Sequence, residues 1–422
     1  MTWSLSRLSD FLVESKGKIK FEDANRLGLQ RIKKIDFSGN IHLDDETDTK
    51  TDMILVKSGD LVISGINASK GAISVYEGEQ DILATIHYSS YEFNPDLISI
   101  IFLKWFFKSS IFNDLLSEQI AGGIKTELKA SRILPLQIKV PNLSEQIFLA
   151  DRLDRFQNKE LRLQAEIKNQ ENYFETLRKA IIFDALCGKL TTKWRANNKS
   201  EDIHKLTKSN SIGLPFDLPE TWTSSRLGEV SQLISGASFL STDFSKGIGI
   251  KCIKITNAGV RELVETDDVL PVIFAEKYKK NKVHKGDLIL ALTRPYISNG
   301  LKVSICPSSY DGALLNQRVA GIRVNEEILH TEFAFLFMRS DVVLKIYQAE
   351  FDAKGQQPNL KNEHVTKLII PIPPLAEQAE IISKVAKLEK HLDHAIRELN
   401  SIKRSKDMLN KAMLKEAFFP AS

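Results

Sequence analysis

One phrase occurs twice in this chain: residues 141–153 read PNLSEQIFLADRL, and residues 373–385 read PPLAEQAEIISKV. Both copies contain the pattern Pro-x-Leu-x-Glu-Gln, and an offset of 232 residues superposes them. The same offset carries Leu177 onto Leu409 and Lys129 onto Lys361. We therefore predict that one structural unit of roughly 200 residues occurs twice in the chain.

Two further pairs of similar stretches lie nearer the start of each copy. The sequence WSLSRL starts at Trp3 and WTSSRL at Trp222, while SGDLVIS starts at Ser58 and KGDLILA at Lys285. Their offsets, 219 and 227, differ from 232, which indicates loop insertions in the second copy. Between the copies lies a polar, Asn-, Ser- and Lys-rich linker. The predicted parts are a first globule (1–140), a first long helix (141–195), the linker (196–221), a second globule (222–372) and a second long helix (373–422).

Heptad spacing follows each phrase. Apolar residues step alternately by four and three, which is typical of a coiled coil. The predicted seam consists of Leu149, Leu153, Phe156, Leu163, Ile167, Phe174 and Leu177 in the first helix and Ile381, Val385, Leu388, Leu392, Leu399, Ile402 and Leu409 in the second. The remaining stretches mix short β-branched runs with helix-like segments. We predict a mixed α+β fold: two α/β globular domains, joined by two long antiparallel coiled-coil helices and related by a pseudo-two-fold repeat.

Composition narrows the class of protein. There are 58 Lys and Arg residues against 54 Asp and Glu, a net charge of +4, which permits a polyanionic partner without requiring one. Cys187, Cys252 and Cys306 are isolated, with no CxxC pair, so we predict no metal site and a reducing compartment. The N-terminus does not resemble a signal peptide, and no apolar run is long enough to span a membrane. A cytoplasmic protein is expected.

Catalytic motifs are sparse. Asp96, Glu127 and Lys129 are the residue types of a metal-dependent nuclease, although the second copy has Asn359 in place of Glu127. The sequence contains neither a phosphate-binding GxxxxGK[ST] motif nor a GxGxxG motif. We expect no cofactor and no catalytic residue, and the nuclease remains an alternative.

Basic runs and polar loops are candidates for DNA contact. Basic runs occur at residues 31–34 and 277–285, and loops with Asn, Lys or Arg follow the two Gly-Asp-Leu segments. An ordinary solvated surface or a simple hairpin turn would explain the same patterns. The candidate DNA-binding residues are Arg31, Lys33, Lys34, Asn67, Lys70, Lys125, Lys129, Lys279, Lys280, Arg294, Tyr296, Asn299, Gln357 and Lys361.

The order of these parts resembles the specificity subunits of type I restriction-modification systems. The segment LRKAIIFDALCGKLTTKW at residues 177–194 is similar to that family's first conserved region, and LPETW at residues 218–222 restarts the second copy. The resemblance implies that each globule recognises one half of a split double-stranded DNA sequence. It also implies that the helices form a spacer and dock two methyltransferase subunits, with restriction or translocase subunits as further partners.

In that family, catalysis belongs to the partner subunits, so the resemblance implies a chain without enzymatic activity of its own. The globules vary widely among members, and the resemblance assigns no base contact to any residue. Two alternatives stay open: a scaffold that binds only proteins, and the stand-alone nuclease.

Overall fold

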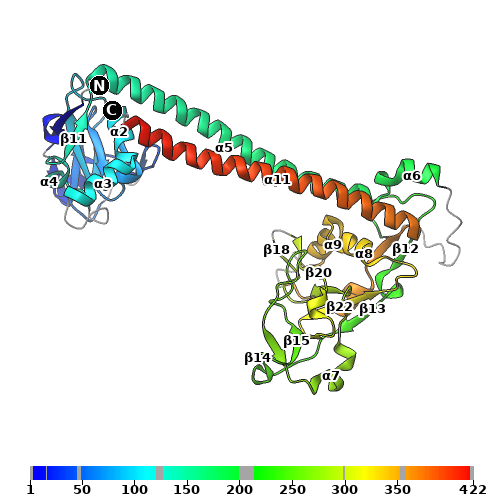
Figure 1. Cartoon of the computed structure of the whole chain (residues 1–422). Helices are drawn as coiled ribbons and strands as arrows, with labels where there is room; N and C mark the ends of the chain where they lie inside the picture. The colour runs from blue at the N-terminus through cyan, green and yellow to red at the C-terminus, as the bar shows by residue number, and fades with distance from the viewer. Residues whose placement is uncertain are drawn as a thin grey trace. The chain divides into compact units, whose positions relative to one another are not determined.

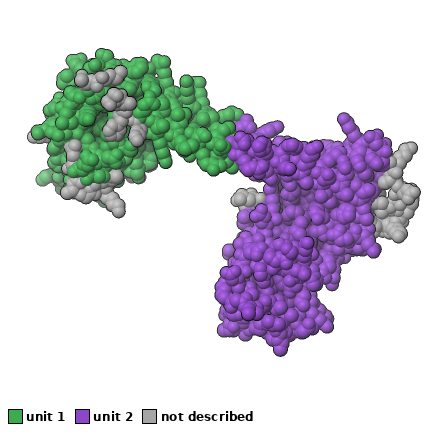
Figure 2. Space-filling model, viewed as in Figure 1, with its two compact units in different colours: residues 1–168, 399–422 green, residues 169–398 purple. Residues whose placement is uncertain are grey.

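The computed structural model describes residues 3–15, 17–44, 49–119, 127–198, 213–297, 300–351 and 358–418. The chain forms two compact units, shown in Figure 2: unit 1 holds residues 1–168 and 399–422, and unit 2 holds residues 169–398. Two helices of 44 residues, α5 (Leu143–Leu186) and α11 (Leu375–Phe418), each contribute to both units (Figure 1). The predicted mixed fold with two long helices is confirmed.

Unit 1 is built around two main sheets. A four-stranded sheet has the order β2 (Leu12–Glu14), β10 (Tyr88–Phe93), β7 (Leu61–Ser64), β8 (Ile73–Val75). A five-stranded sheet has the order β3 (Lys18–Ile19), β6 (Met53–Val56), β9 (Ile82–Thr85), β4 (Arg31–Ile35), β5 (Ile41–Asp44). A separate pair joins β1 (Ser4–Arg7) to β11 (Gln137–Val140). The helices are α1 (Phe21–Leu27), α2 (Ile100–Lys108), α3 (Ser110–Gln119) and α4 (Ala130–Ile133).

Unit 2 repeats part of this plan. Its main sheet has the order β13 (Ser231–Ser235), β22 (Val319–Val324), β17 (Leu288–Ala291), β20 (Val303–Ile305), and β12 (Thr223–Arg226) pairs with β23 (Ile369–Ile372). A second sheet has the order β14 (Ser245–Lys246), β16 (Asp268–Leu270), β15 (Ile250–Ile253), β21 (Leu314–Leu315), and β18 (Tyr296–Ile297) pairs with β19 (Gly300–Leu301). The helices are α6 (Thr192–Asn197), α7 (Phe274–Lys277), α8 (Thr331–Met338), α9 (Asp341–Phe351) and α10 (Asn362–Thr366).

The four-stranded sheets are equivalent strand by strand, which confirms the internal repeat. In both, a Gly-Asp turn precedes the central strand: Gly59 and Gly286 adopt φ angles of 89° and 94°, which favour glycine. The buried carboxylates of Asp60 and Asp287 accept hydrogen bonds from backbone N–H groups at the start of each turn. The repeated Gly-Asp-Leu segment is thus a turn that delivers the chain into a buried strand.

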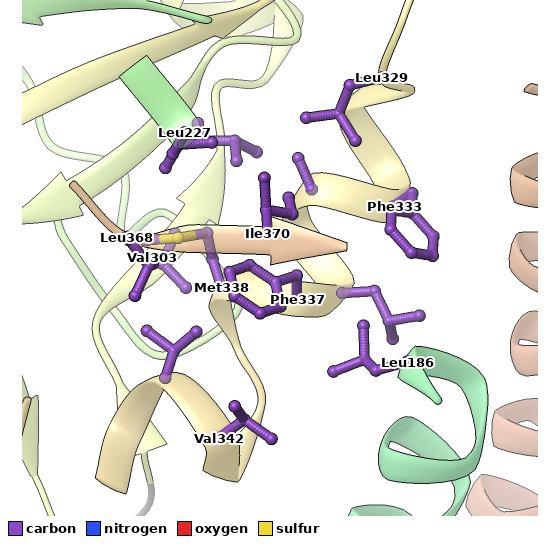
Figure 3. Close-up of a cluster of buried hydrophobic side chains, with 14 of the residues drawn as sticks. Leu186, Leu227, Val303, Leu329, Phe333, Phe337, Met338, Val342, Leu368 and Ile370 are labelled. Carbon is purple, nitrogen blue, oxygen red and sulfur yellow. The ribbon is translucent and has the colours of Figure 1, made fainter. Parts of the chain in front are cut away.

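The end of each long helix packs into a globule core. In unit 2, Leu186 at the end of α5 points toward the cluster that contains Phe337 and Ile370 (Figure 3). In unit 1, Phe418 at the end of α11 packs against the rings of Phe102 and Phe106. Each globule is therefore stabilised by the beginning of one long helix and the end of the other.

The glutamine of the repeated phrase explains why the phrase occurs twice. Buried Gln146 accepts a hydrogen bond from the backbone N–H of Ser99 at 2.8 Å. Its amide donates to the carbonyls of Leu97 and Pro141 at 3.1 and 2.9 Å. Since Ser99 is the N-cap of α2, this one side chain joins the start of a globule helix to the start of α5.

Gln378 makes the same three bonds in unit 2. It accepts from the backbone N–H of His330, the N-cap of α8, at 2.8 Å. It donates to the carbonyls of Ile328 and Pro373 at 2.9 and 2.8 Å. The phrase therefore encodes a junction between globule and long helix, made once in each unit.

The glutamate of the phrase also has a tryptophan partner in each copy. Trp3 donates to Glu145 at 3.4 Å, and Trp222 donates to Glu377 at 2.9 Å. Buried Glu377 accepts in addition from the Thr191 hydroxyl at 2.7 Å and the Arg195 guanidinium at 3.0 Å. In unit 2 these contacts connect the segment after α5 to the start of α11.

Ion pairs show that the two long helices run antiparallel. In unit 1, Lys406 lies 3.6 Å from Glu160, and Arg152 lies 3.2 Å from Glu416. In unit 2, Arg178 pairs with Asp393 at 2.6 Å. This register places Ile167 opposite Leu399, and both are buried. The antiparallel pairing predicted from the heptads is confirmed.

The seam is not uniformly buried, in contrast to the heptad prediction. Leu149 and Leu153 belong to the core of unit 1, and Ile381 and Val385 to the core of unit 2. Ile167, Leu392 and Leu399 are also buried, and Phe156, Phe174 and Leu177 are partly buried. Leu163, Leu388, Ile402 and Leu409 are more than a third exposed. Each long helix has one partner helix, and polar pairs such as Glu160 and Lys406 occupy some of the seam positions. Only part of each apolar stripe is therefore buried.

The seam yields a matched pair of variants. Leu399 is 9% exposed and Leu163 is 39% exposed. We expect Leu399→Lys to lower the free energy of unfolding by about 2–4 kcal/mol, because it places a charge in a buried position. Leu163→Lys should cost less than about 1 kcal/mol, since its ammonium group reaches water. Urea unfolding measures both, and equal losses would contradict the uneven seam.

The phrase glutamine yields a second prediction. Gln378→Met keeps the side-chain length but leaves three buried or part-buried backbone groups without their partner, so we expect a loss of about 2–5 kcal/mol in stability. Gln232→Met on β13, at an exposed position, is the control and should change stability by less than about 0.5 kcal/mol. Thermal melting compares the two, and a near-neutral Gln378→Met would argue against the junction.

Candidate nucleic-acid interface

Three segments of unit 2 meet where β17 ends and β22 begins. The two strands are antiparallel, with Ala291 opposite Val319. Beyond this pair, the backbone N–H of Leu292 donates to the carbonyl of Arg318 at 2.9 Å. The backbone N–H of Leu360 donates in turn to Leu292 at 2.7 Å. The loop after the Gly-Asp-Leu strand is thereby joined to residues 359–361, which read Asn-Leu-Lys. The sequence alone did not connect these two segments.

These segments line a concavity of about 510 Å³. Its lining residues are Ile255, Thr293, Arg294, Arg318 and Asn359. Both arginines are exposed, and within the described ranges neither forms an ion pair with a carboxylate. The concavity is therefore basic, with polar side chains beside the two guanidinium groups.

Arg294 has a backbone conformation that side chains rarely adopt. Its φ angle is 48°, in the left-handed region, and its N–H donates to the carbonyl of Pro358 at 3.0 Å. Such a conformation costs on the order of 1 kcal/mol for a residue other than glycine. Strain of this kind clusters at functional sites, where the surrounding structure maintains it.

Unit 1 contains the same junction. The backbone N–H of Gly65 donates to the carbonyl of His87 at 2.8 Å, and that of Leu128 donates to Gly65 at 2.8 Å. The bonds match those of Leu292 and Leu360 in unit 2. The resulting equivalences are Asn67 with Arg294, His87 with Arg318, Glu127 with Asn359, and Lys129 with Lys361.

The side chains at the unit 1 junction have a different charge balance. The Glu127 carboxylate lies 2.7 Å from His87 Nδ1 and 3.7 Å from Lys129 Nζ. Asp96 lies in a turn before α2, where its N–H donates to the side chain of Asn94. Glu127 is thus engaged by a hydrogen-bond contact with His87 and an ion pair with Lys129. Among the described residues, no group of three or more His, Cys, Asp or Glu side chains is arranged to hold a metal ion.

Among the described residues of unit 2, Arg294 is the one predicted DNA-contacting residue that lines this concavity. Arg31 pairs with Asp44 at 3.1 Å. Lys33 and Lys34 are neighbours that are both exposed, because a register shift interrupts β4 beside them. Lys70 Nζ lies 5.4 Å from the ring centre of Phe37. Lys279 and Lys280 are exposed in a short 3-10 helix, Tyr296 begins β18, and Lys125, Asn299 and Gln357 lie outside the described residues.

Sequence reasoning missed Arg318 and gave His87 no role. Both precede equivalent strands, β22 and β10, so alignment of the two copies at this strand would have paired them. Arg318 does not lie in a basic run of the sequence. The other residues that line the concavity come from other segments of the chain, so the sequence around Arg318 does not indicate a basic site.

A second charged cluster in unit 2 surrounds Glu389. Arg178 and Arg339 approach its carboxylate at 3.7 and 2.9 Å. Burial, and next the nearby charges of Arg178 and Arg339, lower the pKa of Arg261. Arg261 lines a concavity of about 590 Å³ together with Glu175 and Lys179 of α5 and Asp341 of α9. The pairing of arginines with carboxylates here indicates a structural role.

Comparison with known proteins finds one group of similar proteins. Residues 219–404 match the family model described as the type I restriction modification DNA specificity domain. The chain is 25% identical over 362 residues to the type I restriction enzyme MjaVIII specificity subunit of Methanocaldococcus jannaschii, covering 86% of this chain and 79% of that protein. It is 23% identical over 339 residues to the EcoDI specificity subunit of Escherichia coli, covering 78% and 71%.

Solved structures show the same fold. The HsdS subunit from Thermoanaerobacter tengcongensis matches with a TM-score of 0.62 at 15% identity, covering 99% of this chain and 96% of that one. A chain from a structure of a type I restriction-modification system matches with a TM-score of 0.68 at 15% identity, covering 100% and 98%. In the described residues, no helix has the length and apolarity needed to cross a membrane. The doubled architecture and these matches together show that the chain is similar to the specificity subunits of type I restriction-modification systems over most of its length, and that residues 219–404 match their DNA specificity domain.

Proposed function

We propose that this chain is the DNA-recognition subunit of a type I restriction-modification complex and reads a bipartite target, one half with each globule. The observation that carries the proposal is the junction that each unit forms once, with equivalent backbone hydrogen bonds and different side chains. A constant backbone presenting variable polar side chains suits the readout of two different half-sites.

The proposal divides the chain by function. The two recognition domains are residues 1–140 and 222–372, and the spacer helices are residues 141–195 and 373–422, with residues 196–221 as the linker. The domain boundary at residue 140 falls between β11 and α5. Residues on both sides of it are bound by the phrase glutamine, so the domain and its spacer helix stay connected.

The partners follow from the family. We propose that two methyltransferase subunits bind the long helices, with restriction or translocase subunits joining them, and that catalysis and cofactor binding belong to these partners. Exposed apolar side chains on the helices, such as Leu161, Tyr173 and Met408, offer surface for such contacts. The complex would act on double-stranded DNA in the cytoplasm.

An exchange of domains tests modular recognition. Residues 1–140 are replaced by the matching globule of another family member, and methylated sites are mapped in cells that also contain the methyltransferase subunit. One half of the methylated sequence should change and the other should persist, because base readout depends on local groove contacts. A change in both halves would contradict the assignment, and methylation without sequence preference would favour a scaffold that binds only proteins.

Paired insertions test the helices as a spacer. Four residues are added to α5 after Gln164 and four to α11 after Ile402, which are exposed positions away from the buried ends of the helices. Each insertion adds about 6 Å and slightly more than one turn. The unread gap between half-sites should grow by about one or two base pairs, with both half-sites unchanged.

The control carries the four residues in α5 alone. It shifts the register of Ile167 against Leu399 and should therefore lower stability. An unchanged gap in the doubly extended, folded protein would exclude a spacer role for the helices.

A further inference from the structure

We propose that Arg294 and Arg318 form a guanine-reading site in unit 2, which contacts the major-groove edge of guanine in the half-site recognised by that unit. The inference rests on the proposed function, since it specifies what one of the two recognition domains reads. It names two residues, neither of which lies in a basic run of the sequence, and Arg318 was not among the predicted DNA-binding residues.

The chemistry of the side chains determines the base. Guanine presents two acceptors, O6 and N7, side by side in the major groove. The planar guanidinium of arginine donates two parallel hydrogen bonds that match this pair, which makes it the commonest specific partner of guanine. None of the described residues that line the concavity carries a carboxylate, so its two exposed guanidinium groups are available for such acceptors.

The local backbone positions both side chains. Arg318 directly precedes β22, and its carbonyl accepts from Leu292. Arg294 lies two residues beyond Leu292, in its left-handed conformation, and its N–H is bonded to Pro358. Thr293 and Asn359 form a β-bridge beside it. The two arginines thus project from one hydrogen-bonded junction. Because the junction holds their backbone in place, less backbone entropy is lost on binding than in a flexible loop.

The equivalent junction of unit 1 lacks this pair. Asn67 and His87 occupy the positions of Arg294 and Arg318, and Glu127 places a carboxylate 2.7 Å from His87. A carboxylate at the site would repel the electronegative O6 and N7 edge of guanine. The site therefore belongs to the half-site read by unit 2.

Contact with a phosphate is the competing explanation for two exposed arginines. Phosphate contacts carry no sequence information and depend chiefly on charge, so lysine can replace arginine there. Bidentate contact with guanine depends on the fork geometry, so lysine is a poor substitute at that site. The two roles can therefore be separated by variants that keep the charge.

The experiment uses the complex assembled with its methyltransferase subunits and the target duplex found by methylation mapping. Each guanine of the unit 2 half-site is replaced in turn by 7-deazaguanine, which lacks the N7 acceptor, or by inosine, which keeps both O6 and N7. For at least one guanine, 7-deazaguanine should weaken binding by the unmodified protein about ten-fold, whereas inosine should not.

The variants Arg294→Lys and Arg318→Lys connect that guanine to the residues. Each should lose about ten- to a hundred-fold of the discrimination at one position of the half-site, and each should become insensitive to 7-deazaguanine there. Arg226→Lys, at an exposed position on β12, is the control and should behave like the unmodified protein. Thermal melting of every variant should remain unchanged.

Several outcomes would overturn the inference. One is a unit 2 half-site without guanine, and another is equal tolerance of 7-deazaguanine and inosine at every guanine. A third is full base preference in both lysine variants, which indicates phosphate contact. If the unmodified complex shows no sequence preference at all, the proposed function fails instead, so the two failures can be told apart.

Discussion

A buried glutamine side chain joins each globule of this protein to a long helix. Gln146 and Gln378 each satisfy one backbone N–H and two backbone carbonyls with a single amide group. Buried backbone groups at a helix start need such partners, and leaving them unmade is costly. Because the bonds reach both the globule helix and the phrase itself, the long helix begins at a defined place and in a defined direction relative to its globule.

In the two junctions that follow the Gly-Asp-Leu strands, the backbone hydrogen bonds are the same and the side chains differ. The backbone bonds that join Leu292 to Arg318 and Leu360 recur at Gly65, His87 and Leu128. Side chains at the equivalent positions differ in charge and shape, because they are not needed for the fold. A scaffold of this kind can change what it contacts without losing its stability.

The long helices combine two kinds of burial. Near their ends, apolar residues such as Leu153 and Val385 are part of the globule cores. Toward the middle of the helices, exposed leucines such as Leu163 alternate with polar pairs such as Glu160 and Lys406. Apolar burial is therefore most extensive at the ends, and toward the middle buried residues such as Ile167 and Leu399 alternate with exposed apolar surface.

The sequence alone was enough to predict the internal repeat, the two long helices and their antiparallel pairing. Repeats and heptad spacing are patterns that can be recognised in the sequence itself. It also indicated Arg294, which follows a recognisable strand. Only the tertiary structure showed that Arg318, Thr293 and Asn359 share one concavity, since strand pairing brings together residues that are far apart along the chain. The partial exposure of the seam likewise depends on which faces the neighbouring elements cover, and a heptad pattern does not encode that.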